Sequence, residues 1–354
     1  MRIAITSQNL DPRIVVSGIS TVASTIIELS KNEMFFYEMG YRDGDKKNFK
    51  WLLKQLKFIF HFPLFLFKNK IELVHLNVPF DPMGIVREYI ALVISKILAK
   101  KVLLHIHGGK LLMIPTKNKF MLYLIRRILN DSDVVIVLSG LEKDALEANY
   151  GYRKSIVLLN AVDCSKIVFN EFRRKNIKLN VLYLARINES KGIDDIIDAF
   201  EILYQKVPFK FIVCGVGPDK DKFISRCQDI FKTDFVYEGV VAGQKKWEVI
   251  GECDIFILPS RHSEGLPMSL LETMAAGLVP VVTDEASMKY VVIPDENGIR
   301  VKKYNGQDIS DQMFDIMGDD ALLNRYSNAS RKTVEAKYDT TKYVITLDEI
   351  YSKI

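Results

Sequence analysis

Cysteine is scarce in this 354-residue chain, and its four cysteines include no CxxC pair. Zinc sites and disulfide frameworks depend on closely or regularly spaced cysteines, so neither is indicated. Unpaired thiols fit a reducing cytoplasm. The four residues are Cys164, Cys214, Cys227 and Cys253.

Long apolar runs are missing as well. No stretch of 18 consecutive apolar residues occurs, so no segment is predicted to span a bilayer. The first residues, MRIAITSQNL, lack the apolar core of a signal peptide and have the pattern of a first β-strand. We therefore expect a cytoplasmic protein, with peripheral contact at the inner face of the cell membrane as a further option.

The length and the charge distribution both suggest two domains. A chain of 354 residues is too long for one ordinary core, and its 26% charged and 48% hydrophobic residues are typical of a soluble globular protein. Residues 1–160 hold 23 Lys and Arg and 14 Asp and Glu, a net charge of +9. Residues 161–354 hold 26 and 30, which gives −4 and restores the total of +5. The basic first half predicts an anionic contact, such as a phosphate-bearing acceptor or a membrane surface.

One segment of the basic half is rich in Phe, Leu and Lys, namely residues 51–70 with the sequence WLLKQLKFIFHFPLFLFKNK. A helix of this composition can lie in a membrane interface. The alternative is a crossover helix packed under a sheet, with Lys on its outer face and with Pro63 kinking or dividing it. Residues 110–130 leave a similar choice between acceptor and lipid contact, through Lys117, Lys119, Arg126 and Arg127.

The most informative stretch is Asp254–Asp284, DIFILPSRHSEGLPMSLLETMAAGLVPVVTD. Ile255–Leu258 is an apolar run that predicts a buried parallel strand. A Gly-Leu-Pro loop and an Ala-, Leu- and Met-rich helix follow, and the helix is expected to stop at Gly277. Val279–Val282 is a second apolar strand. The order strand, helix, strand is the βαβ unit of a doubly wound sheet.

Two carboxylates lie in this unit, Glu264 in the loop and Glu272 on the helix, with seven residues between them. Ligands of such sheets bind beyond the carboxyl ends of the strands, where the loop is expected. The first-turn amides of the helix have no intrahelical partners and can hold an anion or a sugar oxygen. Glu272 lies about two turns along the helix, on a face that could reach a ribose. The alternative is an exposed Glu and a capping Glu without a ligand.

Two further features are candidates for the same site. Arg186 and Lys191, five residues apart around a loop before a helix, can converge on a diphosphate, although a basic pair is often only a surface feature. His107 ends the predicted buried strand Lys101–His107, KVLLHIH, and precedes two glycines. A lone His is usually a packed, hydrogen-bonded residue, but a His at a strand end before two glycines is better placed to face a cleft.

No metal site is predicted. Asp43-Gly44-Asp45 lies in a polar loop beside Lys46 and Lys47, and we interpret it as a solvated turn. Asp131-Ser132-Asp133 only precedes a strand and has the same interpretation.

The string EGLPMSLLETMAAGLVPVV, which contains Glu264 and Glu272, resembles the Glu-x7-Glu signature of retaining glycosyltransferases of family 4 (glycosyl transferases group 1), which have the GT-B fold. The resemblance implies a nucleotide-sugar donor, with Glu264 beside the donor sugar and Glu272 at the nucleotide ribose. It is most specific over residues 181–284 and looser over residues 1–164. The loop residues that would join Glu264 at the sugar are Gly265, Leu266 and Pro267.

Other segments extend the likeness. ARINESKG is similar to the family segment whose Arg and Lys hold the donor phosphates, which implies that role for Arg186 and Lys191. The pair His107-Gly108 resembles the family's His-Gly pair, whose His contacts the donor sugar. Asn160–Asp163 resembles the Asn-Gly-Val-Asp segment at the end of the first domain.

Two glycines complete the implied donor site, and some positions around them depart from the family pattern. Gly18 resembles the glycine loop after the first strand, although the usual second Gly is Ser17, and Gly215 lies in the expected Gly-rich turn of the second domain. Ala185 replaces the Gly before Arg186. SMKYV stands where the family commonly has a further Glu, so no residue is assigned there, and Tyr290–Val292 and Asn297-Gly298 are expected at the remaining edge of the second sheet.

The sequence is thus interpreted as an α/β protein of the GT-B fold, with two Rossmann-like doubly wound domains facing each other across a cleft. The expected domains are an acceptor-binding domain at residues 1–164, a linker at 165–179, a nucleotide-sugar-binding domain at 180–337, and a final helix at 338–354 that crosses back to the first domain.

The predicted activity is retaining glycosyl transfer without a metal or other cofactor. The donor is a nucleotide diphosphate sugar, with UDP preferred over GDP, and the acceptor is a glycan, such as a lipid-linked oligosaccharide of a bacterial capsule, O-antigen or exopolysaccharide. No nucleic-acid partner is expected. Glu264 and His107 are the candidate catalytic residues. The alternatives are a non-catalytic partner protein of the same fold and a sugar-nucleotide epimerase.

Overall fold

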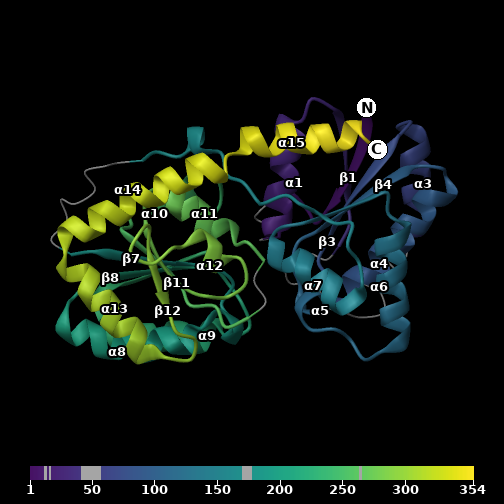
Figure 1. Ribbon diagram of the computed structural model, residues 1–354. Coiled ribbons are helices and arrows are strands. Elements are labelled where there is room, and N and C mark those ends of the chain that lie inside the picture. Colours follow the sequence, from purple (N-terminus) through teal and green to yellow (C-terminus); the bar gives the residue numbers. More distant parts are fainter. Residues whose placement is uncertain (12–13, 16, 41–56, 170–177, 263–264) are drawn as a thin grey trace. The chain divides into compact units, whose positions relative to one another are not determined.

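The computed structural model describes residues 1–11, 14–15, 17–40, 57–169, 178–262 and 265–354. The chain divides into two compact units (Figure 1). The first unit contains Met1–Asn160 and Thr340–Ile354, and the second contains Ala161–Asp339.

The first unit is built on a sheet of six strands in the order β2-β1-β3-β4-β5-β6, and every neighbouring pair is parallel. Both faces of such a sheet are covered, which explains why β3 is buried along its whole length and β4 is buried after Lys101. The chain leaves β1 toward β2 and later moves in the opposite direction toward β3, so a switch point lies between β1 and β3. The strands are β1 Arg2–Ser7, β2 Glu33–Glu38, β3 Leu73–Val78, β4 Lys101–Ile106, β5 Val134–Val137 and β6 Ile156–Val157.

Helices lie on both sides of this sheet. Helix α4 contacts α3 and α6, and these three helices line one side of the sheet, whereas α1 contacts α15 on the other (Figure 1). The two groups lie on opposite sides because crossovers in opposite directions along the sheet are both right-handed. The helices of the unit are α1 Gly18–Leu29, α3 Phe58–Lys68, α4 Pro82–Ile97, α5 Lys110–Met113, α6 Lys119–Asp131, α7 Gly140–Tyr150 and α15 Thr340–Ser352.

The second unit also has six parallel strands, in the order β12-β11-β10-β7-β8-β9. The chain runs outward from β7 to β9, returns beside β7 as β10, and then runs outward in the other direction. The switch point therefore lies between β7 and β10, where ligands of such sheets bind. The strands are β7 Asn180–Leu184, β8 Lys210–Cys214, β9 Phe235–Gly239, β10 Ile255–Leu258, β11 Val279–Thr283 and β12 Ile299–Val301.

The helices of the second unit surround this sheet (Figure 1). One layer is anchored by the edge-on packing of Phe200 on α8 against Phe209, Phe211 and Phe231, all of them buried. The α-helices are α8 Ile193–Lys206, α9 Lys220–Phe231, α10 Gly243–Gly251, α11 Met268–Ala275, α12 Met288–Val291, α13 Gly306–Gly318 and α14 Asp320–Lys337. Short 3-10 helices occur at η1 Cys164–Lys166, η2 Glu189–Lys191 and η3 Lys232–Asp234.

The α/β fold class predicted from the sequence is confirmed, and the βαβ unit of Asp254–Asp284 appears as β10, α11 and β11. Gly277 adopts φ +84° just beyond α11, as the predicted helix stop requires. One detail is wrong. Tyr290–Val292 was expected at the sheet edge but lies at α12, and the edge strand is β12.

The boundaries between the units differ from the expected ones. Residues 161–164 and the described part of the expected linker, 165–169, belong to the second unit. The reason is Arg331 of α14, whose guanidinium donates hydrogen bonds to the carbonyls of Cys164 (3.0 Å) and Ile167 (3.2 Å). The final helix α15 belongs to the first unit, and the segment that returns to this unit begins at Thr340, not at the expected residue 338.

Pro63 neither divides nor ends its segment, contrary to one of our expectations. It lies inside a single helix, α3, and residues 51–56 of the predicted segment fall outside the described part of the chain. No described helix combines the length and the apolar character needed to cross a bilayer.

Candidate active site

The loops that follow β7, β8 and β10 pack closely at the carboxyl edge of the second sheet. Gly192, with φ +72°, lies so near Pro259 that a Cβ atom would overlap the Pro259 carbonyl. Gly215, with φ +137°, lies equally close to the carbonyl of Ala185. Only glycine combines such backbone angles with such close approach. The predicted donor loops are therefore held together by backbone contact at the switch point.

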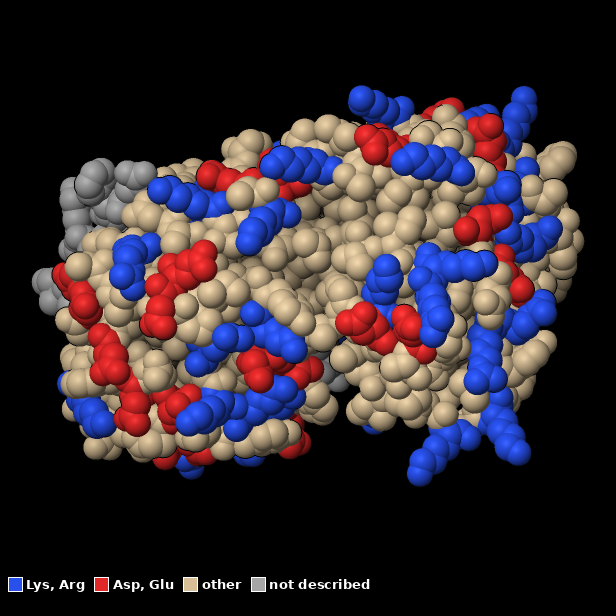
Figure 2. Space-filling view, viewed as in Figure 1, with Lys and Arg blue, Asp and Glu red and all other residues tan. Residues whose placement is uncertain are grey.

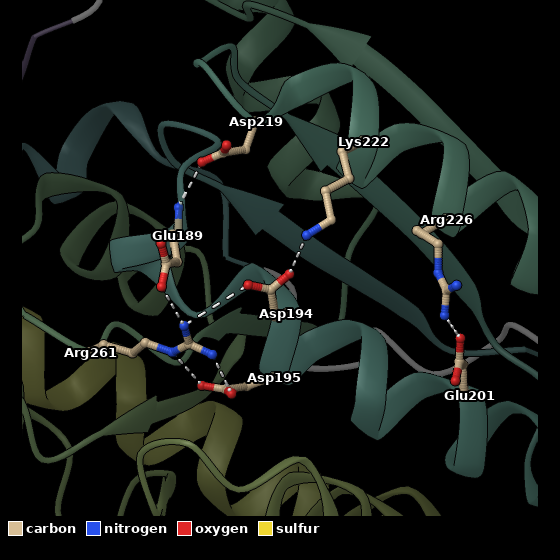
Figure 3. A network of polar contacts seen from close by, with 8 residues as sticks. All are labelled: Glu189, Asp194, Asp195, Glu201, Asp219, Lys222, Arg226 and Arg261. Atoms are coloured by element: carbon tan, nitrogen blue, oxygen red, sulfur yellow. Dashed lines mark hydrogen bonds and ion pairs between the residues drawn. The ribbon is translucent and has the colours of Figure 1, made fainter.

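Arg261, just after β10, is the centre of an ionic network that links these loops (Figure 3). Its guanidinium forms a two-pronged contact with Asp195 of α8, with Nε–Oδ2 at 3.1 Å and Nη2–Oδ1 at 2.7 Å. Glu189 lies 3.4 Å away and Asp194 3.9 Å away. The Tyr304 ring lies 4.6 Å from the guanidinium carbon. Bonding to Asp195 raises the pKa of Arg261, so its charge is permanent.

The same network holds the loop that carries the predicted phosphate ligands. The Arg261 amide donates to the Ser190 carbonyl at 2.8 Å, which joins the β10 loop to η2. The Glu189 amide donates to Asp219 at 3.0 Å, also visible in Figure 3. Lys191 is the last residue of η2 and is half-buried. Arg186 has an exposed side chain, and its backbone carbonyl accepts a bond of 2.7 Å from the buried Tyr183 hydroxyl.

Glu272 is neither exposed nor a helix cap. It lies within α11 and is 5% exposed. The Lys246 ammonium of α10 donates to its Oε1 at 2.7 Å, and the same ammonium lies 4.5 Å from the Trp247 ring centroid. Lys246 thus compensates the buried charge and leaves the second carboxylate oxygen available for a further donor.

The remaining predicted residues of this unit precede α11. Leu266 is buried, and Gly265 and Pro267 are half-buried. Pro267 is the N-cap of α11, with φ −63° and ψ 125°. The helix therefore starts where the sequence predicts. Glu264 lies outside the described residues, so its role stays a prediction.

His107, the predicted catalytic residue of the first unit, directly follows β4. Its Nε2 lies 2.7 Å from Oδ1 of Asn77 at the end of β3. Its amide donates to the Val78 carbonyl at 2.9 Å, which continues the ladder between the two strands. Burial lowers the pKa of His107 to about 3, so the ring is neutral at physiological pH.

A row of buried aromatic polar groups lies behind His107. The His105 ring stacks on His107 with centroids 4.2 Å apart, and His75 follows at 5.3 Å. His75 Nε2 contacts His105 Nδ1 at 3.2 Å, and His75 Nδ1 contacts the Tyr351 hydroxyl of α15 at 2.5 Å. Burial lowers the pKa of His75 to about 3 and holds that of His105 well below its usual value, so the row is uncharged.

Gly18 is the first residue of α1 and is exposed, and the preceding Ser17 makes no side-chain capping bond. Gly18 and His107 belong to the first unit, and Arg186, Lys191, Gly215 and Glu272 belong to the second.

Sequence reasoning missed Asn77, Lys246 and Arg261, because each acts on a partner distant in sequence. The one available signal was the position of Arg261 beside the Glu264 loop.

Among the residues that the structure describes, no group of three or more His, Cys, Asp or Glu side chains could hold a metal ion. Asp131 pairs with Arg127 at 2.8 Å, and Asp133 pairs with Lys96 at 2.5 Å. The Asp43–Asp45 segment lies outside the described residues.

Comparison with known proteins places these two Rossmann-like units in the GT-B class of glycosyltransferases. A sequence profile of the glycosyl transferases group 1 matches residues 165–333, and one of glycosyltransferase family 4 matches residues 32–166. The chain belongs to this glycosyltransferase family, as its motifs indicated.

Two curated relatives and one solved structure illustrate the likeness. The capsular polysaccharide biosynthesis glycosyltransferase CapM of Staphylococcus aureus is 23% identical over 66% of this chain and 65% of its own length. The N,N'-diacetylbacillosaminyl-diphospho-undecaprenol alpha-1,3-N-acetylgalactosaminyltransferase of Campylobacter jejuni is 27% identical over 51% of this chain and 47% of its own. The chain spans about half to two thirds of the length of these relatives. Anabaena HepE, in complex with UDP, has a TM-score of 0.80 at 15% identity, with both chains fully covered.

Proposed function

We propose that this protein transfers a sugar, with retention at the anomeric carbon and without a metal, from a nucleotide diphosphate sugar to a glycan during polysaccharide biosynthesis. The carrying observation is that the Arg186 and Lys191 loop is fastened to the β10 loop at the switch point by Arg261 and Gly192. Two cations held there can neutralise the charge that develops on the departing diphosphate, the part that a metal plays elsewhere. CapM, a capsular polysaccharide enzyme by name, supports the biosynthetic setting.

In the proposed reaction the acceptor hydroxyl attacks the anomeric carbon on the face of the leaving group. The bond from that carbon to the diphosphate oxygen breaks, and the departing phosphate takes the hydroxyl proton. Glu272 binds the ribose, and Glu264, His107 and the amides of 265–267 orient the sugar. A nucleophilic role for Glu264 is the alternative. We favour direct attack because the sequence places only one carboxylate at the sugar.

The proposed donor is a UDP-sugar, with a GDP-sugar as the alternative. The similarity to HepE, which binds UDP, supports the first choice. The proposed acceptor is a lipid-linked oligosaccharide, and the Campylobacter jejuni relative, whose name contains diphospho-undecaprenol, supports a lipid-linked substrate.

Helix α3 supports peripheral contact of the first unit with an anionic membrane. Phe62 and Leu66 face the core at 0% exposure, whereas Phe60, Leu64 and Phe67 are 74%, 68% and 79% exposed. Spacings of four and three residues place these three side chains on one helix face. The inner face of α3 therefore packs against the core, as expected for a crossover helix. Its outer face is apolar, whereas the crossover alternative predicted lysines there. Several basic residues lie on or just after the neighbouring helices α4 and α6, namely Lys96, Lys100, Lys119, Arg126 and Arg127. Figure 2 shows many Lys and Arg side chains on the surface of the first unit.

A thermal-shift panel of UDP, GDP, ADP and their common sugars tests the donor site. A ligand at about 100 times its dissociation constant stabilises the folded state by about 2.7 kcal/mol. We expect UDP to raise the melting temperature of the wild type and to have much less effect on Glu272→Ala. Glu248→Ala, which removes an exposed glutamate of α10, is the matched control and should respond as the wild type does. A missing response to every nucleotide would favour the non-catalytic partner protein.

Vesicle flotation tests the membrane contact. The wild type should float with anionic vesicles and less with neutral ones, and a variant with Phe60, Leu64 and Phe67 all changed to Ser should stay in solution. Val168→Ser, at an 83% exposed site of the second unit, is the control for loss of an exposed apolar side chain. Equal flotation of the triple variant would assign the contact to another surface.

A further inference from the structure

The side-chain amide of Asn77 is fixed in one orientation. Asn77 is 2% exposed, and its Nδ2 lies 2.8 Å from the backbone carbonyl of Thr6 on β1. A carbonyl oxygen can only accept, so the amide NH2 must point toward Thr6. The amide oxygen Oδ1 then points toward Nε2 of His107, 2.7 Å away.

This orientation determines the tautomer of His107. Because Oδ1 can only accept, Nε2 must carry the ring proton. A neutral imidazole has one N–H, so Nδ1 is left with its lone pair and can only accept. The ring is neutral because burial lowers its pKa to about 3. His105, which contacts it on β4, and His75 and Tyr351, which continue the row from β3 and α15, are themselves uncharged.

The plane of the ring is also held. The ring of His105, fully buried, lies against it at 36° between planes, and the amide of His107 is bonded to Val78. The following Gly109, with φ +127°, packs on the backbone of Phe80. The imidazole is therefore constrained by stacking, by the strand ladder and by one amide.

We propose that Asn77 is a positioning residue that holds His107 in the Nε2–H tautomer, so that Nδ1 accepts a hydrogen bond from a hydroxyl of the transferred sugar. The assignment of that hydroxyl rests on the proposed function, whereas the tautomer does not. The site then selects for a group that can donate. A sugar with hydrogen or fluorine in place of that hydroxyl cannot form the bond.

Nitrogen-15 NMR of the imidazoles tests the tautomer directly, because protonated and unprotonated ring nitrogens differ in chemical shift. The chain has five histidines, and the His107→Gln spectrum identifies the signals of His107. We expect the Nε2–H form from pH 5 to pH 9 in the wild type. Asn77→Leu should lose this preference, and Asn77→Asp should raise the pKa of His107 and produce a protonated ring at neutral pH. Asn130→Leu, which changes an exposed asparagine on α6, is the control.

An Nδ1–H tautomer in the wild type, or an unchanged His107 spectrum in Asn77→Leu, would overturn the proposal. The UDP response of the melting temperature reports on the second unit and shows whether each variant is folded and still binds donor. A protein that shows the Nε2–H tautomer but has no nucleotide response would retain the positioning role of Asn77 and lose the proposed function.

Kinetics then separate positioning from mere structural support. Loss of one neutral hydrogen bond corresponds to a decrease of about two- to tenfold in kcat/KM for Asn77→Leu. The Asn77→Asp variant should lose activity as the pH falls and the ring becomes protonated, whereas the wild type should show no such dependence on His107. A flat pH profile for Asn77→Asp would contradict the proposed acceptor role of Nδ1.

Discussion

The chain segments at the carboxyl edges of the two sheets are held together by different kinds of interaction. In the second unit the loops are joined by charges, with Arg261 bonded to Asp195 and Lys246 bonded to Glu272. In the first unit the corresponding edge is joined by neutral groups, with Asn77 bonded to His107 and to Thr6. Fixed charges suit a diphosphate, whereas neutral donors and acceptors of fixed direction suit sugar hydroxyls. The difference teaches that two similar parallel sheets can carry different chemistry at the same edge, charged in the second unit and neutral in the first.

The largest expected effect comes from breaking the ionic network of the second unit. Arg261→Met leaves Asp195, 4% exposed, as a buried carboxylate without its main partner, which should cost about 3–5 kcal/mol of stability. In calorimetric melting, the melting temperature should decrease strongly for the transition of the second unit only. Arg226→Met is the control, because its pair with Glu201 is 51% and 44% exposed and should contribute at most about 1 kcal/mol. Equal effects of the two substitutions would mean that Arg261 is not a structural centre.

Two glycines with the same backbone angle sharpen the comparison between the units. Gly192 and Gly151 both adopt φ +72°, but a Cβ at Gly192 would overlap Pro259, and one at Gly151 would meet no atom within 4 Å. Gly151→Ala should therefore lower the free energy of unfolding only through backbone strain, by about 1–2 kcal/mol. Gly192→Ala should cost about 1–3 kcal/mol more, through overpacking, and should weaken UDP binding. Denaturant titration measures the loss of stability in each variant, and the thermal-shift response measures the loss of UDP binding. Similar costs for both would show that the loops can separate freely.

The last expected effect depends on pH and concerns two buried glutamates. Glu272 has Lys246 as partner, whereas Glu142 of α7 accepts from the Leu138 amide at 2.6 Å and has no described partner for its other oxygen. Burial raises the pKa of Glu142 to about 7. The native state then binds more protons than the unfolded one, so stability falls as the pH rises from about 4.5 to 7. Glu142→Gln should match the wild type at pH 5 and exceed it by about 2–3 kcal/mol at pH 8.

Denaturant titrations at several pH values measure this difference, with Glu147→Gln at an exposed site of the same helix as control. An unchanged pH dependence in Glu142→Gln would show that the carboxyl is ionised in the native state.

Much of the fold follows from local pattern. The apolar runs of β10 and β11 are buried on both faces, and the Pro and Gly near the ends of α11 mark its limits, so Asp254–Asp284 could be interpreted as a βαβ unit from sequence. The position of the residues expected at the linker could not be predicted from sequence. It depends on hydrogen bonds from Arg331 of α14 to the carbonyls of Cys164 and Ile167, more than 160 residues away.

The sequence by itself determined the glycosyltransferase family and the α/β class, and it predicted donor-site roles for Arg186, Lys191 and Glu272, because motifs and hydrophobic periods are local properties of the chain. Only the tertiary structure decided that Lys246 compensates Glu272, that Arg261 joins two loops and that Asn77 orients His107. These pairs lie 26 to 71 residues apart, on different strands and helices. No sequence pattern records such a distance, because it is set by the order of strands in the folded sheet.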